Sequence, residues 1–351
     1  MGIPRKYKDT MNLALDADNY LTASKFCEQL EEILNGKNFP SIPPNDRAKL
    51  LSLSAKISLY LSTDINASAE LLKRSAKEQD KFIASLRKQR YAITSRRRSR
   101  RPTKKEKELA LEIFLAETEY YRLELLRAQI VLFGAEPGSI VHSRNIVNQV
   151  REKIKEDSWK FRFILAYCLY VDTQTYRYAK TSQNLNSFDL NLEAFLSFVS
   201  NLEAQGEESA PKWITELVHE AWVWQAVQFS RREKYSQALQ ELLLIQGGSP
   251  YLSVYVRANV QICFIRAFKL GKLEEANESL GRLKGYDMLP DLKLMWYLSK
   301  VYCQKRLGKQ SDEDYRENVL HLNQLIAKSG SLLKGAFKNE IEKLKSFQAL
   351  A

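Results

Sequence analysis

Residues 109–126 read LALEIFLAETEYYRLELL, and the spacing of their apolar side chains indicates the fold class. Apolar residues recur there at intervals of three or four, as in Leu109, Ile113, Ala116 and Tyr120, which places them on one face of an α-helix. The same spacing runs through most of the chain, whereas the strict alternation typical of strands is scarce. The sequence therefore predicts an all-α protein.

The composition agrees with a folded helical chain. The 351 residues are 44% hydrophobic and 27% charged, which is typical of a folded protein rather than a disordered one. Only 13 glycines and 9 prolines are present, which argues against a fold built from many tight hairpins.

Local signals predict where several helices begin and end. Thr103 and Glu106 have the spacing of a capping box, in which each side chain accepts a hydrogen bond from an unpaired backbone N–H. Ser249 followed by Pro250 predicts a second helix start at the proline. We expect helices to stop or turn at five glycines: Gly134, Gly206, Gly271, Gly285 and Gly308.

A pattern of small and large residues recurs in the C-terminal third. Tyr235-x-x-Ala238-x-x-x-Leu242 is followed 38 residues later by Leu273-x-x-Ala276-x-x-x-Leu280. Weaker copies are Tyr20-x-x-Ala23-x-x-x-Cys27 and the stretch around Trp296, Tyr297 and Gly308.

This pattern resembles the tetratricopeptide repeat, in which small residues let two antiparallel helices approach closely. The resemblance departs from the family at Phe264, where a small residue is usual. It implies antiparallel helix-hairpin repeats stacked into an α-solenoid, and an irregular helical bundle is the alternative. We expect an N-terminal helical region at 1–205 and the clearer repeats at 206–351.

The positive charge of the chain is concentrated in one segment. The formal net charge is +12, and residues 71–107 alone hold 15 Lys and Arg against 3 Asp and Glu, which accounts for the whole excess. The densest run, 96–101, lies just before Pro102 and the capped helix that starts at Thr103. The sequence therefore predicts a long helical hairpin at 71–107 with basic residues at its tip.

Guanidinium and ammonium groups gathered at an exposed turn suit an acidic partner. Nucleic acid, bound through its phosphates, is the leading candidate. Anionic lipid, an acidic protein segment and a nuclear-import receptor are alternatives, as is a solvated turn that only aids solubility. The candidate polyanion-binding residues are Arg87, Lys88, Arg90, Arg96, Arg97, Arg98, Arg100, Arg101, Lys104 and Lys105.

Aromatic residues near this tip are few, so base stacking is not indicated. The aromatic-rich stretch lies elsewhere, and Trp159, Phe163, Tyr167 and Tyr170 share one helical face. That spacing favours a stripe of the hydrophobic core.

The sequence lacks the motifs of catalytic and metal sites. None of its three histidines stands at metal-ligand spacing from another His or Cys, and no glycine-rich phosphate loop or nucleophile motif occurs. We expect no catalysis, no metal and no cofactor.

The compartment is predicted from the cysteines and the hydropathy. Cys27, Cys168, Cys263 and Cys303 lie far apart in apolar stretches, which is typical of buried thiols in a reducing environment. No secretion signal or transmembrane stretch is evident, so we expect an intracellular protein, nuclear in a eukaryote and cytoplasmic otherwise.

These observations predict a non-catalytic scaffold or adaptor that docks protein partners in its solenoid and engages nucleic acid or another polyanion through the basic hairpin. Two alternatives stay open. One is a direct, sequence-independent nucleic-acid-binding protein, and the other is a protein-only adaptor whose basic run is a nuclear-import signal.

Overall fold

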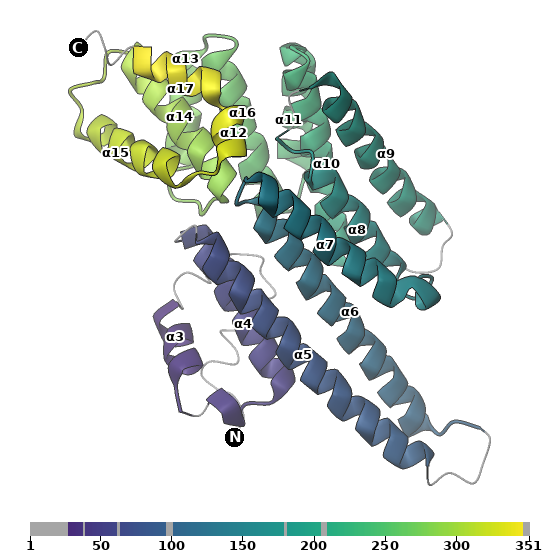
Figure 1. The fold of residues 1–351 in the computed structure, drawn as a ribbon. Helices are drawn as coiled ribbons and strands as arrows, with labels where there is room; N and C mark the ends of the chain where they lie inside the picture. The colour runs from purple at the N-terminus through teal and green to yellow at the C-terminus, as the bar shows by residue number, and fades with distance from the viewer. Residues whose placement is uncertain are drawn as a thin grey trace. The chain divides into compact units, whose positions relative to one another are not determined.

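The computed structural model describes residues 27–37, 39–61, 64–95, 101–178, 181–204 and 209–346. Within these ranges the chain forms fifteen α-helices and two short 3-10 helices, with no strand (Figure 1). Successive helices pack against each other in pairs. The all-α prediction is therefore confirmed.

The chain divides into two compact units. The first contains Met1–Val131 and Ser143–Cys168, and the second contains Leu132–His142 and Leu169–Ala351. The predicted boundary between residues 205 and 206 falls in the stretch 205–208, which lies outside the described residues.

The first unit begins with short helices and continues into two long ones. Helix α3 (Cys27–Asn35) and the 3-10 turn η1 (Phe39–Ser41) pack on α4 (Pro44–Leu61) around Leu30, Leu50 and Leu53. Helix α4 in turn packs along α5 (Ile65–Thr94), where the Ser75 hydroxyl donates to the carbonyl of Ala48 at 2.6 Å.

Helices α5 and α6 (Lys104–Leu132) form the predicted hairpin and run antiparallel, side by side (Figure 1). They contain 30 and 29 residues, or roughly 45 Å of helix each at 1.5 Å per residue. Ile83 and Leu86 of α5 pack against Leu109 and Ile113 of α6. Because this apolar seam extends toward the turn, the hairpin is held together close to its basic end.

The first unit is completed by parts of two further helices. Helix α7 (Pro137–Ile154) is followed by the 3-10 turn η2 (Lys155–Asp157) and by α8 (Arg162–Gln174). The Tyr167 hydroxyl of α8 donates to the Gln129 side chain of α6 at 2.8 Å. Both helices cross the boundary between the units, because each contains residues of both.

The second unit is a run of helical hairpins. Helix α9 (Ser182–Ala204) packs on α10, and three pairs follow: α10 (Lys212–Arg231) with α11 (Tyr235–Gly248), α12 (Leu252–Phe268) with α13 (Leu273–Arg282), and α14 (Pro290–Arg306) with α15 (Glu313–Lys328). The first helices of neighbouring pairs also contact each other. This is the stacking expected of an all-α repeat.

The small residues of the repeat pattern lie where two helices meet. Ala238 and Ala276, each the fourth residue of its helix, are fully buried together with Leu242 and Leu280. Gly271 adopts φ +68°, a left-handed conformation that glycine tolerates at a helix end. The third pair departs from the pattern, because α15 buries Asn318 instead of an alanine.

Two short helices at the C-terminus cover the last two pairs. Helices α16 (Ser331–Ala336) and α17 (Lys338–Ser346) share one core with α12 and α14. Phe337 packs on Phe264 with ring centroids 5.7 Å apart, and Lys269 forms a 3.0 Å ion pair with Glu340.

Of the two helix starts predicted from the sequence, one is confirmed and one is wrong. The capping box is confirmed, because Thr103 N–H donates to the Glu106 carboxylate at 2.6 Å and Glu106 N–H donates to the Thr103 hydroxyl at 3.2 Å. The predicted start at Pro250 is wrong, since α12 begins at Leu252. Ser249 still ends α11, its N–H donating to the Ile245 carbonyl, and the chain needs two more residues to reverse direction.

The aromatic stripe is also only partly a core feature. Tyr167 and Tyr170 are buried and Phe163 is half-buried, but Trp159 is 55% exposed. The prediction was wrong for Trp159 because α8 begins at Arg162, so Trp159 lies in a turn rather than on the helix face. Three of the four cysteines, Cys168, Cys263 and Cys303, are buried and unbridged, and the burial of Cys27 lies outside what is described.

Candidate functional site

The basic residues of the hairpin come from the facing ends of α5 and α6. Arg87, Lys88 and Arg90 lie on the last two turns of α5, which ends at Thr94. Arg101 precedes α6, and Lys104 and Lys105 are its first two residues. All six are exposed to solvent. The remaining four candidates, Arg96, Arg97, Arg98 and Arg100, lie outside the described residues.

The hairpin positions its cations through two local devices. The capping box fixes the start of α6 and so the direction in which Lys104 and Lys105 leave the backbone. Arg87 is held across the hairpin by Glu117 of α6, at 2.6 Å. Arg87 therefore joins the two helices as well as contributing charge.

Three of the six described candidate cations have no acidic partner within the described chain. Lys88, Arg90 and Lys105 form no salt bridge with any described residue. Lys104 approaches Glu108 only at 3.9 Å, with both side chains largely exposed. Exposed pairs of this kind contribute about 0–1 kcal/mol, so they leave the charge available to a partner.

Two leucines of α6 are exposed to solvent, which the sequence did not predict. Leu111 and Leu115 are 58% and 57% exposed, although they belong to the apolar run that predicts the helix. Their positions show why, because Leu109, Ile113 and Ala116 form the buried seam and residues 111 and 115 fall on the other side of the helix.

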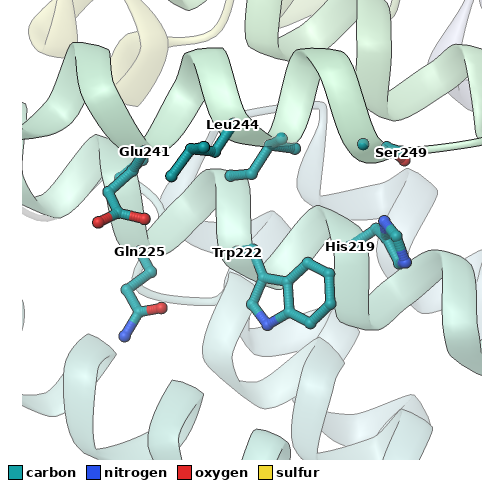
Figure 2. Close-up of a pocket in the computed structure, with 9 residues that line it drawn as sticks. His219, Trp222, Gln225, Glu241, Leu244 and Ser249 are labelled. Atoms are coloured by element: carbon teal, nitrogen blue, oxygen red, sulfur yellow. The ribbon is translucent and has the colours of Figure 1, made fainter.

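A pocket of about 390 Å³ lies between α10 and α11 of the second unit (Figure 2). Its exposed apolar wall is formed by Trp222 and Leu244, which are 40% and 65% exposed. His219 packs against Trp222 and Tyr251 at ring-centroid distances of 4.5 and 5.2 Å. Burial lowers the pKa of His219, which favours the neutral imidazole.

The polar groups of this pocket are dispersed. Glu241 and Gln225 lie at one end, and His219 lies with Ser249 at the other (Figure 2). Such an arrangement suits the binding of an apolar group between Trp222 and Leu244 rather than proton transfer between neighbouring side chains.

A buried ionic cluster occupies the interior of the second unit. The Asp291 carboxylate accepts from Arg177 at 2.8 Å and from Arg257 at 3.3 Å, and Arg257 also contacts Glu220 at 3.1 Å. Burial opposes ionisation of Asp291, but the two guanidinium charges outweigh it and lower its pKa. Sequence reasoning missed this cluster because Arg177 and Asp291 are 114 residues apart.

The described part of the chain contains no group of three or more His, Cys, Asp or Glu side chains placed to hold a metal ion. None of its helices combines the length and hydrophobicity that crossing a membrane requires.

Comparison of the chain with protein-family models, with curated proteins and with solved structures found no match.

Proposed function

We propose that this protein is a non-catalytic helical adaptor, which engages the phosphate backbone of nucleic acid through the α5–α6 hairpin and docks a protein partner on its repeats. The observation that carries the proposal is the set of exposed cations at the hairpin end, of which Lys88, Arg90 and Lys105 have no acidic partner among the described residues. Binding would release counterions condensed on the nucleic acid and would depend little on its sequence.

The protein-docking part of the proposal rests on the pocket between α10 and α11. Helices α12 and α14 are already covered by α16 and α17. The α10–α11 pair instead presents Trp222 and Leu244 to solvent beside a pocket. An amphipathic helix of a partner could place an apolar side chain there, as in other helix-in-groove complexes.

A charge-matched pair of variants tests the nucleic-acid part. The hairpin variant carries Lys88→Gln, Arg90→Gln and Lys105→Gln, and the control carries Lys309→Gln, Lys328→Gln and Lys345→Gln, which are exposed lysines of the second unit. Both lose three positive charges. Fluorescence anisotropy with a short labelled DNA duplex should show weakened binding for the hairpin variant and binding near the wild-type level for the control.

Two other outcomes contradict the proposal in different ways. Equal weakening in both variants would mean that overall charge, rather than the hairpin, attracts the duplex. No change in either would leave nuclear-import signalling or an acidic protein partner as the role of the basic residues.

A further inference from the structure

A second cavity of the second unit, separate from the pocket in Figure 2, is lined by both charged and aromatic side chains. Its volume is about 340 Å³, within the range of small-molecule sites. Apolar walls come from Trp224, Phe264 and Phe337, and the charged lining includes Arg177 and Arg231. Further lining residues, Glu233 and Lys269, are exposed, so the cavity communicates with solvent.

Buried polar atoms on five of the residues that line this cavity have no hydrogen-bond partner among the described residues. They are the N–H groups of Arg177 Nε, Trp224 Nε1 and Arg231 Nη1, together with the Tyr178 hydroxyl and Asp291 Oδ1. Leaving a buried polar atom without a partner is costly, so such groups are usually satisfied by water or by a ligand. Because N–H donors outnumber the single carboxylate acceptor, the missing group is one that accepts hydrogen bonds.

The lining carries three cations, Arg177, Arg231 and Lys269, and three carboxylates, of which Asp291 and Glu340 are buried and Glu233 is exposed to solvent. Arg177 is paired with Asp291 at 2.8 Å, and Lys269 is paired with Glu340 at 3.0 Å. Arg231 donates to the backbone carbonyl of Arg177, and no salt bridge joins it to a carboxylate of the described chain. Burial and the charge of Arg177 lower the pKa of Arg231 to about 10, which still leaves it protonated at neutral pH.

We propose that this cavity binds a small organic carboxylate, whose negative charge is neutralised by Arg231 and whose apolar body contacts Phe264 and Phe337. The guanidinium and the neighbouring N–H donors would satisfy the carboxylate oxygens. An aromatic or aliphatic body is indicated because Phe264 of α12, Leu333 of α16 and Phe337 give the cavity apolar lining beside the polar Gln261 and Glu340.

The test compares 4-phenylbutyrate with its uncharged analogue 4-phenylbutanamide by isothermal titration calorimetry on the full chain. The two molecules share the same apolar body and differ in charge. The acid should bind about 10- to 100-fold more tightly, the range expected for a hydrogen-bonded charge pair. Equal affinities, or no heat from the acid up to about 10 mM, would overturn the proposal.

Neighbouring arginines supply a matched pair of variants. Arg231→Met removes the cavity charge, whereas Arg232→Met removes an adjacent one that pairs with Asp189 outside the cavity lining. Arg231→Met should abolish the preference for the acid over the amide, and Arg232→Met should keep it. Loss of the preference in both variants, with helical dichroism intact, would contradict the role of Arg231. The wild-type comparison of acid and amide decides the proposal even where a variant fails to fold.

Discussion

Gly330→Ala should destabilise the second unit, because a methyl group at this position meets backbone on the neighbouring turn. A Cβ built on Gly330 lies 2.1 Å from the carbonyl oxygen of Gly134 and 2.6 Å from that of Ala135. Gly330 has φ −69°, a conformation that alanine adopts readily. The expected cost therefore comes from the close approach and not from backbone strain.

The loss of stability can be estimated from the shift that the added methyl group forces between the segment at Gly330 and the turn at Gly134 and Ala135. Separating the two segments relieves the overlap but weakens the hydrogen bond from Leu332 N–H to the Ala135 carbonyl, now 2.8 Å long. Overpacking costs about 1–3 kcal/mol and a lost hydrogen bond about 1 kcal/mol, so the free energy of unfolding should fall by roughly 2–4 kcal/mol.

Urea denaturation followed by tryptophan fluorescence measures this loss. Gly281→Ala is the matched control, since it lies in α13 and its added Cβ meets no atom within 4 Å. Because alanine has a higher helix propensity than glycine, the free energy of unfolding of this control should be unchanged or higher by up to about 1 kcal/mol. A Gly330→Ala variant that unfolds at the same urea concentration as Gly281→Ala would refute the proposed contact between the two turns.

Three further predictions concern stability. Replacing Ala238 or Ala276 by leucine should overpack the helix pairs and lower the free energy of unfolding, measured by urea denaturation, by about 1–3 kcal/mol. The control Gln240→Leu lies on the exposed face and should cost little, so equal midpoints for the three variants would contradict the repeat packing. Asp291→Asn should cost about 3–5 kcal/mol, because it leaves the buried Arg177 guanidinium without a carboxylate, whereas Arg257 keeps its contact with Glu220. Because the pKa of Asp291 is lowered in the folded protein, this stabilisation is lost as pH falls below the ordinary aspartate range, and a variant whose acid denaturation matches the wild type would argue against it. Thr103→Ala should cost about 1 kcal/mol through the lost helix cap, measured by thermal unfolding, and an unchanged midpoint would show that the cap does not limit stability.

Sequence reasoning predicted the features that depend on near neighbours in the chain. The capping box at Thr103 and Glu106 joins residues three apart, so its spacing alone is enough to find it. Ala238 and Ala276 were found because a helix that packs closely against its hairpin partner needs a small residue at one fixed place. Whether these hairpins belong to the tetratricopeptide family stays a prediction.

Features built from distant segments could not be predicted in the same way. The pairing of Arg177 with Asp291 depends on the stacking of several helices, and nothing in the sequence near either residue indicates it. The docking of Ser331 N–H on the Glu136 carboxylate, at 2.7 Å, spans 195 residues. The exposure of Leu111 and Leu115 likewise depends on which face of α6 the hairpin partner covers.

The salt dependence of duplex binding tests the proposed role of the basic hairpin most directly. Changing Arg96, Arg97, Arg98, Arg100 and Arg101 together to serine removes five positive charges from the sequence that joins α5 to α6. Where each neutralises one phosphate, the log–log slope of affinity against salt should be steeper for the wild type by roughly 4.5, at about 0.9 per contact. Equal slopes and equal affinities for the two proteins would contradict binding of nucleic acid through these five arginines.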